Sequence, residues 1–475
     1  MFFSHNLDKA SGAHMSHTKQ IPVQFYETLF TNSVSISREA GEIFKKCKNK
    51  EALISDITDR RTENGLAPQT SGLLLQLLNT QNRDPSENQR LRQIVLDKAR
   101  TLREQLYGHD VAVMVPIEIS SFCASNCSFC GWRSDNKDMV RLKISPSGIE
   151  KEIESLSHYG FSHYEIVAGD DLNFIKNDLE GIIKLFKSKL KELNTGARVS
   201  ICLTPLLKPH YETLKKAGLD TVLTWQETYN FENYRKLITS GPKANGITTD
   251  FKVAKNEDGC LMRMSSHEVC VQTGLQVGLG VMLGLDETDP EADILSAIQH
   301  ANKLIETYRD TIQPIIIGMP IWNPITTART DNSVHHKSKV SGEEDFELIS
   351  AIYLLSLPDR FAWVFPNCRV SKKTQLESIK TAGCFTSGMV RVGPGAYLNF
   401  DKKVDFTDTF VKSSEKVEAL TQEKVLTGEQ FQHHFDSQEN YNKRFKEENL
   451  IQVKETKFLA ELIQKEKHRK KKKVA

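Results

Sequence analysis

Three cysteines in the stretch SSFCASNCSFCGWRSDN are spaced so that they could bind one metal cluster together. Cys123, Cys127 and Cys130 follow the pattern Cys-x3-Cys-x2-Cys. Three thiolates fit three corners of a four-iron cubane, and thiolate is the soft ligand that iron–sulfur clusters require. The fourth iron would then lack a protein ligand and could bind a small molecule directly. Phe129, just before the third cysteine, could shield such a cluster from water.

A zinc site and a disulfide scaffold both explain this cysteine pattern less well. A structural zinc ion normally takes four protein ligands, and no CxxC or HxxxH partner stands elsewhere in the sequence. The chain has nine cysteines, scattered apart from the three above, which is typical of a reducing compartment. Four of them are isolated, and we expect buried small hydrophobes rather than ligands at Cys202, Cys260, Cys270 and Cys368.

The segments around the cysteines alternate between short apolar, β-forming runs and amphipathic, helix-like stretches. The eight β-forming runs cover residues 111–119, 163–168, 198–204, 221–225, 275–283, 313–320, 361–366 and 387–393. Eight strand–helix alternations predict an α/β fold with a parallel (β/α)8 barrel, and an open doubly wound sheet is the alternative. The cysteines directly follow the first run, where a barrel carries its catalytic groups.

The remaining parts of the chain predict extensions on both sides of the barrel. Residues 1–20 are polar and predicted to be disordered, 21–107 form a helical extension, and 108–400 form the barrel. Residues 401–475 are a charged helical or disordered extension ending in KEKHRKKKKVA. That end is a solvated tail or a polyanion-binding arm. We expect the chain after about residue 440 to be dispensable for chemistry, because its lysine-rich end lacks apolar periodicity and cannot contribute a core.

The global composition excludes several classes of function. The 475 residues carry 63 basic and 61 acidic side chains, a net charge of +2, so nucleic acid binding is not expected. No run of about 18 apolar residues exists, so we expect no membrane span. The first residues lack a basic start followed by an apolar core, so we expect no secretory signal. A cytoplasmic protein acting on a small molecule fits best.

The cysteine spacing after the first predicted strand resembles the radical S-adenosylmethionine (SAM) superfamily, over about residues 85–400. The resemblance implies a TIM-type barrel that holds a [4Fe–4S] cluster whose open iron binds the amino and carboxylate groups of SAM. An electron, from a donor such as flavodoxin or ferredoxin, would split SAM into methionine and a 5′-deoxyadenosyl radical. That radical would abstract hydrogen from the substrate, so the barrel must exclude water and hold this hydrogen close.

Two further stretches resemble parts of the SAM site in that superfamily. In EIVAGDD, Gly169 and Asp170 stand where the family has a Gly-Gly-Glu-like motif that contacts the SAM amino group. In GVMLGLDE, the residues Gly280, Met282 and Gly284 match a strand-five motif whose backbone passes close to the adenine. Glycine permits such an approach because no Cβ intrudes.

The stretch WQETYNFENYRKLITSGPK resembles one subgroup, the aromatic amino acid lyases. This subgroup is related to biotin synthase and contains the tyrosine lyases of thiamin biosynthesis and hydrogenase maturation and the tryptophan lyase of antibiotic biosynthesis. The matching residues include Gln226, Glu227 and Lys243, and Arg141 belongs to a further matching stretch. The resemblance implies that Gln226 and Glu227 bind the ribose or amino acid part of SAM. It also implies that Arg263 pairs with the SAM carboxylate.

The late segment NCRVSKK resembles the strand-seven motif of the same lyases. Arg369 matches the arginine that clamps the substrate carboxylate in the tryptophan lyase, and Val370 replaces the neighbouring acid. Glu118 stands where the lyases often have a tyrosine. We therefore expect Arg369, Glu118 and Glu227 to be the catalytic residues, while these departures leave the substrate open.

These observations predict a radical SAM carbon–carbon lyase or rearrangement enzyme that acts on an amino acid, with an aromatic one favoured. The alternatives are a sulfur-inserting enzyme like biotin synthase and a mutase like the methylornithine enzyme. A non-catalytic iron–sulfur scaffold or sensor is a third interpretation, which the matches around the whole SAM site disfavour. No cysteine follows Cys384, which argues against the second cluster of the hydrogenase-maturation lyase.

Overall fold

The structure is a computed structural model of the chain. It describes residues 20–79, 83–137, 139, 141–255, 257–286, 288–323, 342–398, 430–431 and 437–454. The segment 1–20, for which disorder is predicted, lies outside the described residues except for Gln20. The lysine-rich end and the polyanion-binding alternative for it also lie outside them. The domain boundaries given above stay predictions.

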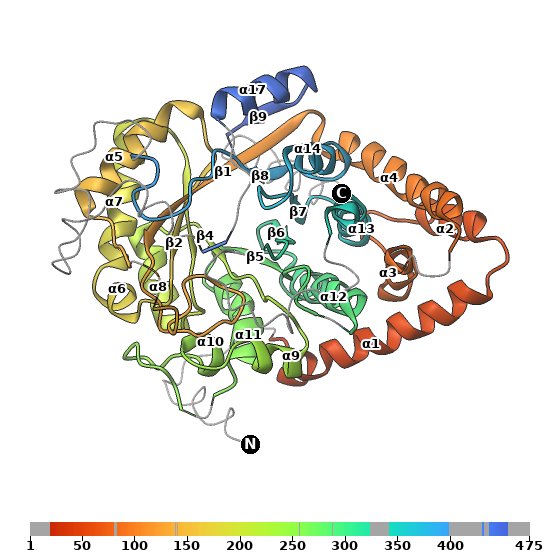
Figure 1. Ribbon diagram of the computed structural model, residues 1–475, viewed down its shortest axis with the longest axis horizontal. Helices are drawn as coiled ribbons and strands as arrows, with labels where there is room; N and C mark the ends of the chain where they lie inside the picture. Colours follow the sequence, from red (N-terminus) through yellow and green to blue (C-terminus); the bar gives the residue numbers. More distant parts are fainter. Residues whose placement is uncertain are drawn as a thin grey trace, which may run out of the picture.

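Eight parallel strands form a nearly closed barrel at the centre of the molecule (Figure 1). The strands are β1 (Asp110–Ser120), β2 (His163–Ala168), β3 (Arg198–Cys202), β4 (Thr221–Leu223), β5 (Gln276–Gly280), β6 (Ile315–Gly318), β7 (Ala362–Phe365) and β8 (Phe385–Ser387). They are hydrogen-bonded in the order β7-β6-β5-β4-β3-β2-β1-β8. The rings of Phe365 and Phe385, 5.2 Å apart, bring the two ends of this path together. The predicted TIM-type barrel is confirmed, and the open doubly wound sheet is excluded.

Helices between the strands cover the outside of the barrel, as the strand–helix alternation predicts (Figure 1). They are α5 (Pro146–Leu156), α6 (Leu172–Asn177), α7 (Leu179–Glu192), α8 (Lys208–Ala217), α9 (Phe231–Leu237), α10 (Pro242–Asn245), α11 (Gly259–Gln272), α12 (Pro290–Tyr308), α13 (Phe346–Ser356) and α14 (Lys372–Thr381). Local sequence fixes their ends: Ser145 caps α5 by accepting a hydrogen bond from the backbone N–H of Gly148, and Pro146 opens the first turn.

Four helices precede the barrel and pack against one side of it (Figure 1). They are α1 (Val23–Lys46), α2 (Lys50–Asp59), α3 (Pro68–Leu75) and α4 (Pro85–Tyr107). α1 lies against α12, and α4 lies against α13. The carboxylate of Glu268 on α11 accepts hydrogen bonds from the backbone N–H of Ile21, at 2.7 Å, and from the Tyr26 hydroxyl, at 3.2 Å. These contacts tie the start of the helical part to the barrel.

The eighth strand ends earlier than the sequence predicts. β8 covers Phe385–Ser387 instead of residues 387–393, and the following segment 388–398 turns across the barrel. There the Tyr397 hydroxyl donates to the carbonyl oxygen of Pro116 in β1, at 2.7 Å. Val390 and Val392 of this segment are buried in a small cluster with Cys368, and their alternation resembles a strand in sequence.

Part of the chain after about residue 440 belongs to the folded core, and its predicted dispensability for chemistry stays a prediction. Helix α17 (Gln438–Glu447) and strand β9 (Ile451–Val453) follow the barrel, and β9 pairs with the start of β1. Tyr441, Phe445 and Leu450 are buried in the main hydrophobic core. Residues 438–453 therefore belong to the folded body.

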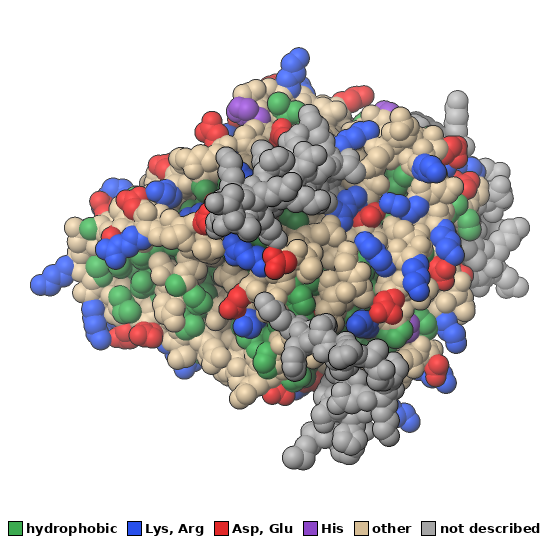
Figure 2. All heavy atoms as spheres, turned by 180° about the vertical axis from the view of Figure 1, so that it is seen from behind, with side chains coloured by type: hydrophobic (Ala, Val, Ile, Leu, Met, Phe, Trp, Pro, Cys, Tyr) green, Lys and Arg blue, Asp and Glu red, His purple; other side chains and the backbone are tan. Residues whose placement is uncertain are grey.

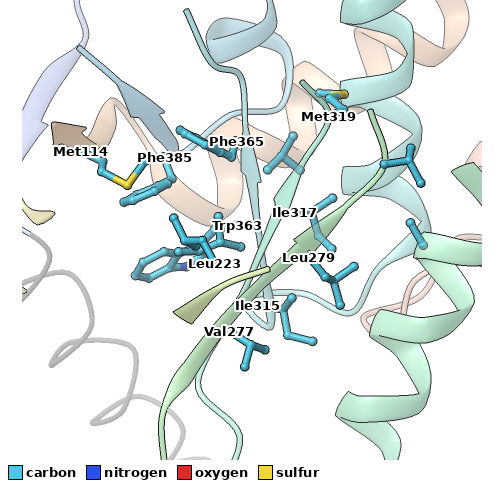
Figure 3. Close-up of a cluster of buried hydrophobic side chains, with 14 of the residues drawn as sticks. Met114, Leu223, Val277, Leu279, Ile315, Ile317, Met319, Trp363, Phe365 and Phe385 are labelled. Atoms are coloured by element: carbon cyan, nitrogen blue, oxygen red, sulfur yellow. The ribbon is translucent and has the colours of Figure 1, made fainter. Parts of the chain in front are cut away.

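A dense apolar core supports the strands that end at the functional site. Figure 3 shows part of it, with labelled side chains contributed by β1, by β4 to β8 and by Met319, which follows β6. The indole of Trp363 stacks on Phe385 with ring centroids 5.8 Å apart. Close packing of this kind fixes strand positions to fractions of an ångström, which a site built on strand ends requires.

The molecular surface shows basic and acidic side chains interspersed on the face drawn in Figure 2. This agrees with the near-balanced charge of the sequence. None of the described helices is long and apolar enough to cross a membrane.

The buried face of α17 provides a test of its role in the fold. Replacing Phe445 with alanine removes a ring that is 4% exposed and should lower the free energy of unfolding by about 3–5 kcal/mol. Lys443, on the same helix with a side chain that is 75% exposed, provides the matched control, and its replacement by alanine should change stability by less than about 0.5 kcal/mol. Thermal unfolding should separate the two variants. Equal melting temperatures would contradict the assignment of α17 to the core.

Candidate active site

A cavity opens at the C-terminal ends of the barrel strands, where a barrel of this class carries its site. Most of the residues predicted for the site meet on its wall. These are Glu118, Cys123, Cys127, Cys130, Gly169, Asp170, Glu227, Arg263, Met282 and Arg369. The topology brings them together from β1, from the loops after β1, β2, β4, β5 and β7, and from helix α11.

Four predicted residues do not line this cavity. They are Phe129, Gln226, Gly280 and Gly284. The Gln226 side chain lies in the core, where its amide donates to the Thr228 carbonyl oxygen and to the Cys260 sulfur, both at 3.3 Å. A Cβ at Gly280 would collide with the carbonyl oxygen of Gly318 in β6, so the close approach of two strands accounts for this glycine.

The loop that carries the three cysteines, residues 121–133, is held on one side by Gly169 and Asp170. A Cβ at Gly169 would overlap the carbonyl oxygen of Phe122 and the Cβ of Cys123. The backbone N–H of Asp170 donates to the Cys123 sulfur at 3.3 Å, and the Asp170 carboxylate accepts a hydrogen bond from the Ser125 hydroxyl. Glycine is needed at position 169 because the strand end and the cysteine loop touch there.

The other side of this cysteine loop is held by the Gly241-Pro242-Lys243 motif. Gly241 has φ +87°, and a Cβ there would collide with the carbonyl oxygen of Ala124. The backbone N–H of Lys243 donates to the Ser125 hydroxyl at 3.0 Å. The backbone of Cys127 forms an isolated antiparallel β-bridge with that of Ile238, just before the motif. The motif therefore positions the cysteines as well as supplying an ammonium group.

Arg141 fastens the end of the same loop. Its guanidinium donates to four carbonyl oxygens, those of Ser121, Trp132, Arg133 and Asn136, over 2.6–3.2 Å. A planar guanidinium with five donors can satisfy several carbonyls at once, which a lysine cannot do in the same geometry. The sequence singled out Arg141 only by resemblance, and the structure shows what it does.

The three thiols sit in an environment that suits a bound cluster better than free thiolates. Burial raises the pKa of all three, that of Cys123 to about 12, so the free thiols stay protonated. Burial also dominates at Cys127 and Cys130, but the Lys243 ammonium acts in the opposite direction on both and favours their thiolates. Iron would replace the protons, and Lys243 would compensate the negative charge.

Three thiols on one cavity wall are a ligand set that a multi-iron cluster takes. In the part of the chain that the structure describes, no group of three or more His, Cys, Asp or Glu side chains could hold a single metal ion. A cubane separates its ligands, because each thiolate binds a different iron. The three cysteines on one cavity wall therefore match three corners of a [4Fe–4S] cluster.

A group of charged side chains lies beside the cysteine loop. Glu227, which has φ +71°, pairs with the Lys243 ammonium at 3.0 Å and with Arg263 at 3.6 Å. Burial opposes ionisation of Glu227, but these two cations outweigh it and lower the pKa of the carboxyl group. The backbone N–H of Met282 donates to the Glu227 carbonyl oxygen at 2.9 Å. The strand-five motif thus fixes the strained backbone of Glu227.

Three buried polar atoms in this region have no hydrogen-bond partner among the described residues: Glu227 Oε2, Arg263 Nη1 and Arg369 Nη1. Leaving such atoms unpaired is costly, and the cost is higher for charged groups. A ligand that carries carboxylates and hydroxyl or amino donors would satisfy all three. The amino acid and ribose parts of SAM, with a second carboxylate for Arg369, have this chemistry.

The sequence analysis missed Phe431, which comes from the chain after the barrel. Its ring packs on Phe129 with centroids 6.5 Å apart, and the Arg369 guanidinium lies 3.7 Å from its centroid. The neighbouring carbonyl oxygen of Gln430 accepts a hydrogen bond from the backbone N–H of Gly131 at 3.1 Å. No local signal marks these residues, because their contacts lie some 60 to 300 residues away in the chain.

Two isolated cysteines also take a place that the sequence did not assign. Cys202 and Cys368 line the cavity, whereas Cys260 and Cys270 are buried away from it. The prediction of small buried residues therefore fits Cys260 and Cys270 better than it fits Cys202 and Cys368.

The fold and the cysteine site are those expected of a radical SAM domain, and the comparison with known families agrees. The model of the radical SAM superfamily matches residues 117–298, so the chain carries a radical SAM domain. The predicted superfamily is confirmed.

Among curated proteins, the chain is similar to the 2-iminoacetate synthase of Escherichia coli strain K12, with 26% identity over 40% of this chain and 45% of that protein. It is 28% identical to the [FeFe] hydrogenase maturase subunit HydE of Thermotoga maritima over 39% of this chain and 47% of that protein. The 3-methylornithine synthase of Methanosarcina acetivorans is 23% identical over 66% of this chain and 80% of that protein. The chain thus spans less than half the length of the first two relatives.

Among solved structures, the hydrogenase maturase HydG from Carboxydothermus hydrogenoformans superposes with a TM-score of 0.71 at 21% identity. The match covers 92% of this chain and 86% of that one. At this identity the likeness shows the fold. The similarity to a 2-iminoacetate synthase fits the predicted resemblance to the aromatic amino acid lyase subgroup.

The cluster assignment predicts the iron content of variants. After anaerobic reconstitution the protein should hold about four iron atoms per chain. Replacing Cys127 with alanine should remove them, whereas replacing Cys270, a buried cysteine outside the cavity, should not. Iron analysis and the visible spectrum measure this. Full iron retention in a triple alanine variant of the loop cysteines would refute the assignment.

The contact of Gly169 with the cysteine loop predicts a difference between two glycines. Gly169→Ala should displace the loop and impair cluster assembly, because its Cβ would meet backbone atoms. Gly181→Ala, inside helix α7, has open space around the new methyl group and should stabilise the helix by about 0.5–1 kcal/mol. Iron per chain and melting temperature should be compared in both variants. Normal iron content in Gly169→Ala would show that the loop is not held as described.

Proposed function

We propose that this protein is a radical SAM enzyme that abstracts hydrogen from an amino acid and so breaks or rearranges a carbon–carbon bond. One observation carries the proposal. Arg369 is half-buried, its buried Nη1 has no hydrogen-bond partner among the described residues, and it lines the same cavity as the three loop cysteines, Glu227 and Arg263. A carboxylate is the natural partner of such a guanidinium, since it accepts two parallel hydrogen bonds.

Each group of residues has its own task in this proposal. When bound, the cluster and SAM supply a 5′-deoxyadenosyl radical that removes a hydrogen atom from the substrate. Arg263 and Glu227 hold the amino acid and ribose parts of SAM, and Asp170 takes part in binding its amino group. Arg369 holds the substrate carboxylate, which keeps the reacting hydrogen in a fixed position.

Other residues of the cavity shape it and exclude water. Phe431 packs on Phe129 of the cysteine loop, and Trp132 within that loop is completely buried. Glu118 accepts a hydrogen bond from the backbone N–H of Gly393, which fixes the segment that crosses the barrel. We assign Glu118 this positioning role, in addition to its place on the cavity wall.

An external electron donor and a cytoplasmic location are part of the proposal. Cluster chemistry of this kind needs one electron per turnover, and flavodoxin or ferredoxin are suitable donors. All nine cysteines are free thiols in the structure, which agrees with a reducing compartment.

A mutase is the second candidate, because the similarity to a 3-methylornithine synthase extends over 66% of this chain. Lyase and mutase differ in the product. A mutase product has the mass of its substrate, whereas a lyase yields two smaller fragments. Sulfur insertion would need a further cluster. In the described part of the chain, Cys202 and Cys368 are the free cavity thiols outside the cysteine loop, too few to hold one alone.

Anaerobic turnover tests the proposed function directly. Reconstituted protein is incubated with SAM, dithionite and a panel of amino acids, and products are identified by mass spectrometry. We expect 5′-deoxyadenosine formation that rises with one amino acid, together with cleaved or isomeric product. The triple alanine variant of the loop cysteines is the control. SAM cleavage that no amino acid stimulates would contradict the proposal.

The two arginines should separate substrate binding from SAM binding. Removing one partner of a buried charge pair costs about 2–5 kcal/mol, so Arg369→Ala should weaken amino acid binding about 30-fold or more. SAM binding should persist in that variant. Arg263→Ala should show the reverse pattern and lose SAM affinity first. Isothermal titration measures both affinities.

A purely structural role of Arg369 would give a different result in the same variant. If Arg369 served only to pair with a carboxylate of the barrel, its loss would lower the melting temperature and leave amino acid affinity intact. An unchanged affinity in a well-folded Arg369→Ala protein would remove the main support for an amino acid substrate.

A further inference from the structure

Glu165 is an ionisable group of the cavity that the proposed function does not use. It lies on β2, opposite Pro116 of β1 and Ser200 of β3 in the strand register. Because side chains alternate along a strand, Glu165 and Val167 point to the same side, and both line the cavity. The residue is 5% exposed. Glu165 therefore faces the space that the substrate would occupy, deeper in the barrel than the end of β2.

The protein gives this carboxyl group little compensation for its burial. Among the described residues its hydrogen-bond partner is the Cys202 thiol, a weak donor, and Arg369 attracts it through the cavity. Burial raises the pKa of Glu165 to about 8, against the opposing effects of Cys202 and Arg369. A buried carboxyl group with one weak donor is costly unless a ligand supplies a better one.

The other acidic groups of the cavity already have strong partners. Glu227 pairs with Lys243 and Arg263. Asp170 accepts from the Ser125 hydroxyl, and Glu118 accepts from a backbone N–H. Glu165 thus differs from each of them, because the only donor described for its carboxyl group is a weak one, the Cys202 thiol.

An aromatic surface accompanies Glu165 in the same cavity. The rings of Trp225 and Phe365 are stacked, with centroids 5.9 Å apart and planes 19° apart, and both line the cavity. Gly318 of β6 lies directly against the Trp225 indole, because any Cβ there would overlap the ring. The indole is therefore fixed in place, and its apolar surface can pack against the middle of a substrate.

We infer that Glu165 recognises the far end of the substrate: an amino acid whose side chain ends in a hydrogen-bond donor, held at its carboxylate by Arg369 and at its donor by Glu165. The inference rests on the proposed function and narrows its substrate class. Two kinds of donor have this chemistry, a neutral hydroxyl on an aromatic ring and an ammonium on an alkyl chain. A substrate lacking the donor would leave the buried carboxyl group unpaired, so the site should discriminate strongly against such a substrate.

Matched pairs of amino acids test this specificity in the reconstituted holoenzyme loaded with SAM. The pairs are tyrosine with phenylalanine and lysine with norleucine, which differ mainly in the terminal donor. Isothermal titration of the unmodified protein should show that one donor-bearing member binds about tenfold or more tightly than its partner. Equal affinities within both pairs would overturn the inference without any variant.

Substitutions then assign the preference to Glu165 and identify the donor. Glu165→Ala should abolish the difference within the preferred pair. Glu165→Gln keeps an acceptor oxygen but no charge, so it should keep a preference for the ring hydroxyl and lose a preference for the ammonium. Glu152 on α5, also buried but outside the cavity, provides the matched control, and Glu152→Gln should keep the full preference.

The outcomes separate this inference from the proposed function. A preference that survives Glu165→Ala overturns the role of Glu165. Amino acid binding that depends on Arg369 but discriminates neither pair leaves the proposed function standing and refutes the inference. If no amino acid binds the SAM-loaded enzyme, both fail.

Discussion

The candidate active site depends on how the barrel holds three thiols of one short loop at its mouth, those of Cys127 and Cys130 buried and that of Cys123 half-buried. This loop has no regular secondary structure, so its position comes from neighbours on both sides. Gly169 and Gly241 leave no room for a side chain where they meet it, and Asp170 and Arg141 bond its polar atoms. Because Gly169 and Asp170 directly follow β2, Gly241 follows β4 and Arg141 follows β1, the barrel itself sets where the cysteines lie.

The same loop links the cluster position to the rest of the cavity through charge. Lys243 acts on Cys127 and Cys130 and pairs with Glu227, which in turn pairs with Arg263. One buried carboxylate thus pairs with two cations, and one of them, Lys243, also acts on the thiols. In a low-dielectric site such pairs depend strongly on one another, so a change in any member alters the whole group.

Much of this arrangement could be predicted from the sequence because its signals are local. Each of these signals can be read from a few tens of residues at a time: the cysteine spacing, each strand–helix unit, and the stretch around Glu227. The long-range contacts could not be predicted. Phe431 reaches the cavity from beyond the barrel, and β9 pairs with β1, more than 300 residues away in sequence. Gly280 matched a motif, but the structure shows that the approach of β6 requires it.

The central claim is that one cluster with an iron free of protein ligands faces the substrate cavity. Electron paramagnetic resonance of the reduced, reconstituted protein tests it most directly, with spectra recorded before and after SAM is added. Binding of SAM to the open iron changes the ligand field of that iron, so the spectrum of the reduced cluster should shift. Arg263→Ala should require more SAM for the same shift. A spectrum that stays unchanged while SAM is shown to bind would contradict the account.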